Sequence, residues 1–188
     1  MKDINATLNE ALKTLKSGGT IVYPTDTVYG IGCDATNYEA VSKIYQIKQR
    51  EESKALICLV SDFKMLKDYV SFVPKMAYDI LKYANRPTTI IYDKPKHVAE
   101  NLIAEDNTLA IRIIHKGFAH ELIKLLKKPI VSTSANISGQ PTPKAFKEIH
   151  SDILKEVDYV VPLQNEKKNA KPSSIIKLSN DGIVKIIR

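Results

Sequence analysis

The chain has 188 residues, which is long enough to bury one substantial hydrophobic core, and we expect a single domain covering residues 1–188. With 44% apolar and 26% charged residues it has the composition of an ordinary globular protein. No apolar run reaches the roughly 18 residues needed to cross a bilayer, and residues 1–5 have no apolar leader segment. These features predict a cytoplasmic protein without a membrane span.

The charge and the metal-binding residue types narrow the possible partners. Lys and Arg exceed Asp and Glu by 28 to 21, a net charge of +7, which is typical of a protein with an anionic partner such as a nucleotide or a nucleic acid. Lysine-rich surfaces also serve solubility alone. Cys33 and Cys58 form no Cys-x-x-Cys pair, and the four histidines are scattered. We therefore expect reduced thiols and no metal held by the protein itself.

Apolar spacing predicts strands and helices that alternate along the chain. The expected helices are 7–17, 36–49 (opened by a capping box of Thr36 and Glu39), about 62–69, 74–84, 117–128 and 143–156. The expected strands are 20–23, 55–60, 88–92, 109–114, 129–131, 159–161, 174–178 and 183–187, with a basic loop at 166–171 and a hairpin turn at 180–182. This order predicts an α/β fold, with one twisted mixed sheet flanked by helices.

The first candidate site is the segment 23–35, Y-P-T-D-T-V-Y-G-I-G-C-D-A. The strand 20–23 is expected to stop at Pro24, which cannot donate to a sheet ladder. Two hydroxyls, a carboxylate and two glycines follow, and such loops at strand ends often bind ligands in open α/β sheets. The alternative is an ordinary connection from strand to helix.

The second candidate is Lys48-x-Arg50 with Lys54, three cations within seven residues at the end of a predicted helix. Lysine as a point charge and arginine as a bidentate donor suit a polyphosphate. Cations also suit the solvated C-terminal end of a helix, so both interpretations stay open at this stage.

Arg112 and the segment 132–139 are the third and fourth candidates. Arg112 is a lone charge in an apolar strand, and a buried charge is costly unless it is paired. It is expected either to pair with a carboxylate of the protein or to reach a cavity and hold a ligand carboxylate. Segment 132–139, S-T-S-A-N-I-S-G, has the hydroxyls and backbone N–H groups of an anion nest, or of a simple capped turn.

The sequence lacks the motifs of several common reaction classes. The chain has no Gly-x-x-x-x-Gly-Lys-Ser/Thr loop and no Gly-x-Ser-x-Gly, and no Cys/His or His/Asp arrangement indicates a nucleophile. If the protein is an enzyme, we expect it to act by positioning and charge stabilisation, without a covalent intermediate.

Five segments taken together resemble the YrdC-like family, in that family's order and over the whole chain. They are P-T-D-T-V-Y-G-I-G-C-D-A at 24–35, K-x-R at 48–50, A-I-R-I at 110–113, S-T-S-A-N-I-S-G at 132–139 and P-S-S-I-I-K-L at 172–178. The likeness is to short, single-domain TsaC-type members, the L-threonylcarbamoyladenylate synthases. The sequence ends at Arg188, and the expectation is that the additional C-terminal domain of longer members is missing.

The resemblance implies a nucleotidyltransferase that converts L-threonine, bicarbonate and ATP into threonylcarbamoyl-AMP and pyrophosphate. A downstream transferase complex would then form N6-threonylcarbamoyladenosine at position 37 of tRNA. Mg²⁺ is expected with ATP, and direct binding of tRNA or double-stranded RNA is possible within the family. Two alternatives remain, namely a YciO-like paralogue and a non-catalytic RNA-binding protein.

The resemblance also implies roles for individual residues. Lys48 and Arg50 would stabilise the transition state. The ATP site would comprise Lys48, Arg50, Lys54, Thr108, Ser134, Asn136, Thr142 and Arg188, and the threonine site Thr27, Arg112, Ser132 and Ser173. The chain departs from the family pattern at Lys54 and Leu59, where Asn and His are common, and at 85–89, N-R-P-T-T in place of P-G-P-x-T.

Overall fold

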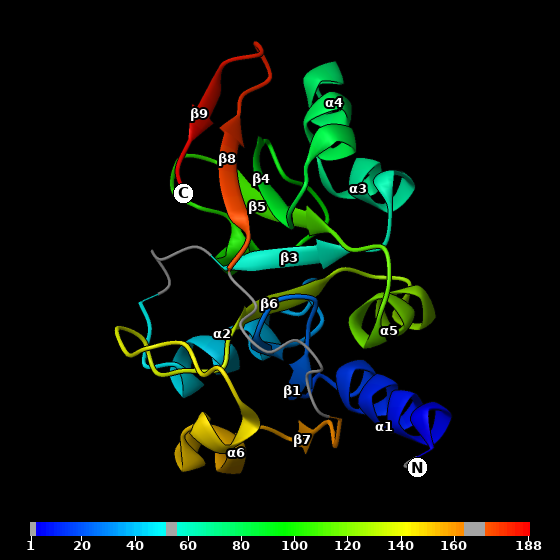
Figure 1. The fold of residues 1–188 in the computed structure, drawn as a ribbon, viewed down its shortest axis with the longest axis vertical. Coiled ribbons are helices and arrows are strands. Elements are labelled where there is room, and N and C mark those ends of the chain that lie inside the picture. The colour runs from blue at the N-terminus through cyan, green and yellow to red at the C-terminus, as the bar shows by residue number, and fades with distance from the viewer. Residues whose placement is uncertain (1–2, 52–55, 164–171) are drawn as a thin grey trace.

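A single sheet of nine strands forms the centre of this computed structural model, which describes residues 3–51, 56–163 and 172–188 (Figure 1). The strands are β1 (Ile21–Pro24), β2 (Tyr29–Gly32), β3 (Ile57–Val60), β4 (Thr88–Asp93), β5 (Thr108–Ile113), β6 (Ile130–Ser134), β7 (Tyr159–Val160), β8 (Ser174–Leu178) and β9 (Val184–Ile186). The α-helices are α1 (Ile4–Lys16), α2 (Tyr38–Ile47), α3 (Phe63–Tyr69), α4 (Lys75–Tyr83), α5 (Phe118–Leu126) and α6 (Ser151–Glu156). Two 3₁₀ turns cover Glu100–Leu102 and Phe146–Glu148.

The strand order is β7-β1-β2-β6-β3-β5-β4-β8-β9, so β7 and β9 are the two edges. The pairs β1–β7, β3–β5 and β4–β8 are parallel, and the remaining pairs are antiparallel. The predicted mixed sheet is therefore confirmed. β6 lies next to the central strand β3, pairing with it through residues 130–132 and with β2 through residues 133–134.

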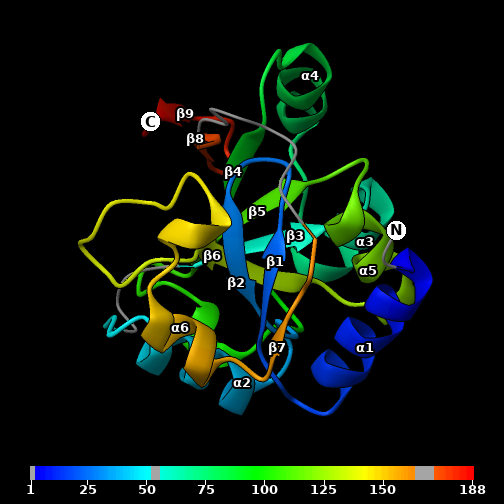
Figure 2. The same cartoon turned by 60° about the horizontal axis from the view of Figure 1, so that its bottom comes forward.

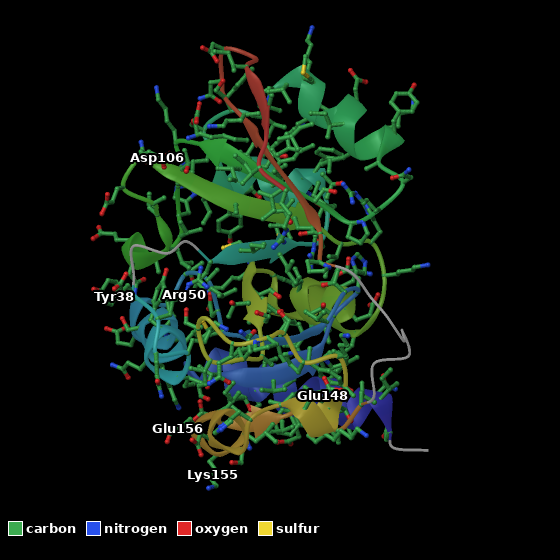
Figure 3. All side chains as sticks on the ribbon, turned by 60° about the vertical axis from the view of Figure 1, so that its left-hand side comes forward. Tyr38, Arg50, Asp106, Glu148, Lys155 and Glu156 are labelled. Atoms are coloured by element: carbon green, nitrogen blue, oxygen red, sulfur yellow. The ribbon has the colours of Figure 1, made fainter. Side chains whose placement is uncertain are left out.

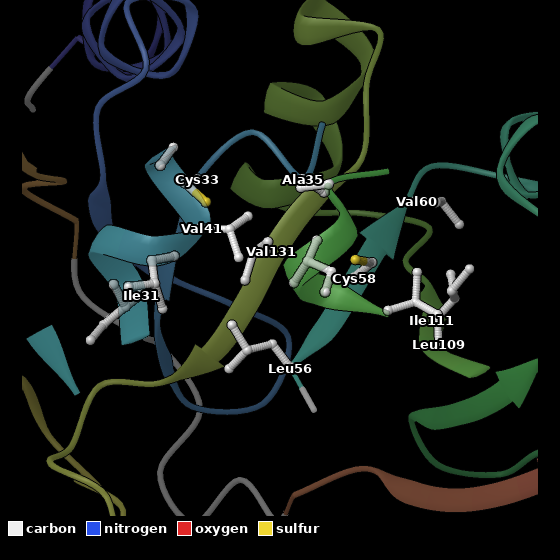
Figure 4. Close-up of a cluster of buried hydrophobic side chains, with 14 of the residues drawn as sticks. Ile31, Cys33, Ala35, Val41, Leu56, Cys58, Val60, Leu109, Ile111 and Val131 are labelled. Carbon is white, nitrogen blue, oxygen red and sulfur yellow. The ribbon is translucent and has the colours of Figure 1, made fainter. Parts of the chain in front are cut away.

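Helices cover both faces of the sheet. Successive apolar side chains of its inner strands point to opposite faces, so each face needs a cover and a separate hydrophobic core forms on each side. Ile21 and Tyr23 of β1 belong to one core cluster, while Val22 between them belongs to the other. The first cluster is covered by α1 and α5, and the second by α2 and α6 together with other segments (Figure 2). Figure 4 shows part of the second cluster, including Cys58 and Val131. No helix in the described part of the chain is long and apolar enough to span a membrane.

The segment 23–35, predicted to be one open loop, is mainly a β-hairpin. β1 continues through Pro24, and residues 29–32 form β2, with Tyr23 opposite Gly30 and Ile21 opposite Gly32. A Cβ at Gly32 would lie 2.7 Å from Tyr23 Cε1 and closer still to the Val131 carbonyl, so glycine is required where β2 fits between β1 and β6. The prediction failed because it interpreted glycines packed in a strand as loop residues.

Two helix predictions also need correction. Asn37, and not Thr36, caps α2, because its side chain accepts from the Ala40 N–H at 3.0 Å while Thr36 donates its hydroxyl to Asp34 at 2.7 Å. The helix expected at 143–156 is reduced to a 3₁₀ turn and α6, since Ala145 and Ile149 have extended backbones. The hairpin turn at 180–182 is confirmed between β8 and β9. The basic loop expected at 166–171 lies outside the described residues.

Candidate active site

A cavity of about 320 Å³ opens where the tip of the β1–β2 hairpin meets the ends of β6 and β8. Its polar wall contains three arginines and many hydroxyls, and its described lining has no carboxylate side chain. The lining residues are Thr25, Thr27, Val28, Gly30, Arg50, Leu56, Ile57, Ile91, Ala110, Arg112, Ser132, Thr133, Ser134, Thr142, Pro172, Ser173, Ile175, Ile187 and Arg188. Cations and hydroxyl donors in a partly enclosed space suit an anionic ligand.

Most of the residues predicted from the sequence converge on this cavity. All four residues predicted for the threonine site line it, as do four of those predicted for ATP: Thr27, Arg112, Ser132 and Ser173, together with Arg50, Ser134, Thr142 and Arg188. Lys48, Thr108 and Asn136 are described but do not line it. Lys54 lies outside the described residues.

The hairpin tip is held by hydrogen bonds among its own residues. The Thr25 hydroxyl donates to the Val28 carbonyl at 2.7 Å, and the Thr27 N–H donates to the Thr25 hydroxyl oxygen at 3.0 Å. Thr27 is buried. Below the tip, a Cβ at Gly30 would lie 3.2 Å from both Ser132 Oγ and Thr25 Cγ2. The absence of a side chain at Gly30 thus leaves space in the cavity wall.

Arg112 pairs with a carboxylate of the protein, the first alternative considered from the sequence, and it also lines the cavity, while its contact with a ligand carboxylate stays a prediction. Its side chain is only 5% exposed, and its Nη2 donates to Asp26 Oδ1 at 2.9 Å. Its Nε is buried and has no hydrogen-bond partner in the described part of the chain. A buried donor without a hydrogen-bond partner costs about 1–3 kcal/mol, so Arg112 is a candidate for contact with a bound ligand.

Tyr23 lies behind Arg112 and Ser132 in the core. Its hydroxyl donates to the Val131 carbonyl at 3.5 Å. Burial raises the pKa of Tyr23 well above its usual range, and the Ser132 hydroxyl and the Arg112 charge offset only part of this effect. Tyr23 therefore stays a neutral phenol within the core.

The other two arginines reach the cavity from different ends of the chain. Arg50 lies just beyond the end of α2 (Figure 3), and burial lowers the pKa of its guanidinium. Arg188 donates from Nε and Nη2 to the Ser173 carbonyl at 3.2 and 3.1 Å. The Ser173 hydroxyl in turn shares a hydrogen bond of 2.8 Å with Thr89. These contacts fix Arg188 and Ser173 relative to each other.

Lys48 is placed differently from the sequence expectation. It is the C-cap of α2 and only 1% exposed, and its ammonium donates to the carbonyls of Ser134 at 2.5 Å and Asn136 at 2.6 Å. The Ser138 N–H returns a bond of 2.9 Å to the Lys48 carbonyl. Burial, with a smaller contribution from Arg50, lowers the pKa of Lys48 to about 8. This position favours support of the 134–138 loop over direct contact with phosphate.

Thr108 and Asn136 also use their side chains within the protein. The Thr108 hydroxyl donates to Asp106 Oδ1 at 2.6 Å, and the Asn136 amide donates to the Ile137 and Gln140 carbonyls at 2.9 and 2.8 Å. Asn136 Oδ1 is buried and accepts no hydrogen bond from the described residues. The roles of both residues toward a nucleotide stay predictions.

Sequence reasoning missed the apolar wall of the cavity and the partner of Arg112. Side chains such as Leu56, Ile91 and Ala110 line the cavity, but nothing in the sequence separates them from other apolar strand residues. Asp26 was noted only as part of a polar loop. It is the one carboxylate at the hairpin tip, 86 residues before Arg112, and that sequence separation hid the pair.

The thiols and the acidic residues provide no competing centre. Cys33 and Cys58 are both buried, and burial raises the pKa of both, that of Cys58 to about 12. In the residues that the structure describes, no group of three or more His, Cys, Asp and Glu is placed to hold a metal ion.

The fold and the site define a mixed α/β protein with a cavity, lined by arginines and hydroxyls, that suits a small anionic ligand. The chain belongs to the Sua5/YciO/YrdC family, whose model, described as telomere recombination, matches residues 13–188. It is 38% identical over 175 residues to a Methanocaldococcus jannaschii protein provisionally named threonylcarbamoyl-AMP synthase, covering 93% of this chain and 81% of that one. It is 34% identical over 176 residues to the threonylcarbamoyl-AMP synthase of Pseudoalteromonas translucida, covering 90% of this chain and 92% of that protein.

Two solved structures have the same fold. P. abyssi Sua5 complexed with L-threonine superposes with a TM-score of 0.86 at 26% identity, over 96% of this chain. The matched region is 53% of that Sua5 chain, so the present chain spans about half its length. E. coli YciO superposes with a TM-score of 0.84 at 27% identity, over 99% of this chain and 89% of that one.

Proposed function

We propose that this protein is an L-threonylcarbamoyladenylate synthase, a nucleotidyltransferase that makes threonylcarbamoyl-AMP and pyrophosphate from L-threonine, bicarbonate and ATP. The observation that carries the proposal is Arg112, a buried cation on the cavity wall whose Nε has no hydrogen-bond partner among the described residues. Two relatives named as threonylcarbamoyl-AMP synthases, and a Sua5 structure that contains L-threonine, support the same activity.

The threonine site is proposed at the Arg112 end of the cavity. The Arg112 guanidinium would bind the carboxylate of threonine, because guanidinium and carboxylate match in charge and in planar geometry. Thr27, Ser132 and Ser173 offer hydroxyls that can donate to or accept from the side-chain hydroxyl and the amino group of threonine.

The nucleotide is proposed to bind along Arg50, Ser134, Thr142 and Arg188, which bring two cations and two hydroxyls to the same cavity. Lys54, Thr108 and Asn136 stay in the proposed ATP site on the sequence resemblance. Lys48 would act through the Ser134 and Asn136 carbonyls. Because the described lining has no carboxylate, Mg²⁺ is proposed to arrive on the triphosphate oxygens, as part of the substrate.

Two bond-forming steps account for the product. The neutral amine of threonine attacks the carbon of bicarbonate, which forms a C–N bond, releases water and leaves a carbamate. A carbamate oxygen then attacks the α-phosphorus of ATP, and the bond to the β-phosphate oxygen breaks, so that pyrophosphate leaves with the electron pair. Arginines along the phosphates would stabilise the charge that develops in this step.

The biological setting is proposed from the same activity. A downstream transferase complex would use threonylcarbamoyl-AMP to form N6-threonylcarbamoyladenosine at position 37 of tRNA, in the cytoplasm. The net charge of +7 is compatible with contact between this protein and tRNA.

The testing experiment measures pyrophosphate release from ATP, with threonine and bicarbonate each omitted in turn. We expect release only when all three substrates are present. The likeness to E. coli YciO, which extends over 89% of that chain, supports a second candidate, a paralogue with another activity. Absence of release under every condition, from folded protein, would reject the synthase and favour this paralogue or an RNA-binding protein.

A further inference from the structure

The ion pair between Asp26 and Arg112 joins parts of the sheet that are not neighbours. Asp26 lies at the tip of the β1–β2 hairpin and Arg112 lies in β5, while β6 and β3 separate β2 from β5 in the sheet. The hairpin tip therefore reaches across two strands to place a carboxylate 2.9 Å from the guanidinium. Because Thr25 and Thr27 on either side of Asp26 line the cavity, as Arg112 does, this contact lies directly beside the cavity.

Asp26 has the features of a residue that acts through its neighbour. It does not itself line the cavity, and its side chain is 24% exposed, against 5% for Arg112. Its place is set by the turn, in which the Thr25 hydroxyl bonds both to the Val28 carbonyl and to the Thr27 N–H. A carboxylate held in this way fixes the nitrogen it contacts.

Fixing one nitrogen of a guanidinium orients the whole group, because its atoms are coplanar. Asp26 Oδ1 accepts a hydrogen bond from Arg112 Nη2, while Nε is buried without a hydrogen-bond partner among the described residues. The remaining donors of Arg112 are therefore available in one defined orientation, as a ligand carboxylate requires.

The pair also sets the charge at this end of the cavity. Asp26 offsets part of the charge of Arg112, its partner at 2.9 Å. A guanidinium already paired with one carboxylate attracts a multiply charged phosphate less strongly than an unpaired one does. The pairing would thus direct triphosphate away from Arg112. Arg112 would then be left to bind an amino acid with a single carboxylate.

We propose that Asp26 is a positioning residue that orients Arg112 for the carboxylate of the amino-acid substrate and lowers the affinity of that subsite for phosphate. This inference rests on the proposed function, because it deepens the threonine site.

The test is a double-mutant cycle, in which calorimetry measures binding of L-threonine without nucleotide. The proteins are wild type, Asp26→Asn, Asp26→Ala, Arg112→Ala and the double variant Asp26→Asn/Arg112→Ala, with Asp79→Ala as a control for loss of an exposed carboxylate. We expect Asp26→Ala to weaken threonine binding about tenfold or more and Asp26→Asn to weaken it less, because an amide oxygen can still accept from Nη2. In the Arg112→Ala background, Asp26→Asn should have no further effect.

Inorganic phosphate supplies a readout that a merely structural role would not change. We expect phosphate to compete with threonine more effectively in Asp26→Asn than in wild type, because the charge of Arg112 is then less offset. ATP affinity should stay within about twofold of wild type. Since Asp26→Ala removes the partner of a buried charge and could unfold the protein, the nearly isosteric Asn variant keeps the test decisive.

Independent effects of Asp26→Asn and Arg112→Ala on threonine affinity would overturn the inference, as would unchanged phosphate competition. Those outcomes would leave the proposed function intact, provided that wild type binds threonine and releases pyrophosphate. Failure of folded wild type to bind threonine would instead reject the threonine site, and this inference with it.

Discussion

The ammonium of Lys48 lies 2.5 Å from the carbonyl oxygen of Ser134, and the Ser134 residue also lines the cavity. Lys48 thus ties the end of α2 to the loop that follows β6. Its burial separates it from Arg50, which is two residues later and lines the cavity directly. The two cations of one short motif therefore lie in different surroundings, one inside the protein and one on the cavity wall.

The low pKa of Lys48 predicts a pH dependence of stability. Its pKa is about 8 in the folded protein and 10.5 ordinarily, so between these values the unfolded chain binds more protons. The free energy of unfolding therefore rises with pH between 8 and 10.5. The stabilisation that depends on neutral Lys48 is complete above pH 10.5 and is lost as the pH falls through 8. The difference corresponds to about 3 kcal/mol.

Urea unfolding of wild type and Lys48→Met between pH 7 and 10.5 measures this contribution. We expect wild type to gain stability relative to Lys48→Met as the pH rises, and Lys116→Met, which removes an exposed lysine, to follow wild type. Parallel curves for wild type and Lys48→Met would show that Lys48 keeps an ordinary pKa.

Arg112→Ala should impair threonine binding much more than ATP binding. Loss of a charge-assisted bidentate contact of about 3 kcal/mol corresponds to roughly a hundredfold in affinity. Calorimetry with each substrate measures the two effects separately, and Arg86→Ala controls for loss of an exposed arginine. Equal losses for both substrates would indicate that Arg112 is structural.

Arg50→Ala should weaken ATP binding by about tenfold or more, because a cation facing the proposed triphosphate site is lost. Arg50→Lys should recover part of the affinity, since it keeps the charge but not the bidentate geometry. Titration of ATP at two salt concentrations checks this expectation. Unchanged affinity in Arg50→Ala would remove Arg50 from the triphosphate site.

Gly30→Ala should mainly weaken substrate binding, whereas Gly32→Ala should mainly lower the stability of the fold. A methyl group at Gly30 enters the cavity wall 3.2 Å from Ser132 Oγ, so KM for threonine should rise several-fold with little loss of stability. A methyl group at Gly32 would lie 2.7 Å from a ring carbon of Tyr23 and still closer to the Val131 carbonyl, which should cost about 1–3 kcal/mol. Urea unfolding and substrate titration of both variants measure these effects. Equal destabilisation of the two variants would contradict the assignment of Gly30 to the cavity.

The sequence by itself determined most of the elements and most of the chemistry. The spacing of apolar residues predicted strands and helices that alternate along the chain, and this order predicted the mixed α/β fold. The lone charge of Arg112 in an apolar strand marked Arg112 as a residue that needs a partner. The hydroxyls of 132–139 and the cation at Arg50 were recognisable from their neighbours in the chain. These features are local, because side-chain periodicity and the cost of burying a charge are expressed within a few residues.

Only the tertiary structure decided which of these groups meet. The pairing of Asp26 with Arg112 depends on the sheet order β1-β2-β6-β3-β5, which no local pattern encodes. The burial of Lys48 depends on where the Ser134 and Asn136 carbonyls come to lie, and the strand role of Gly32 on the close approach of Tyr23 and Val131. The physical reason is that strand order is selected by the burial of the whole core, and contacts between distant residues follow from that order.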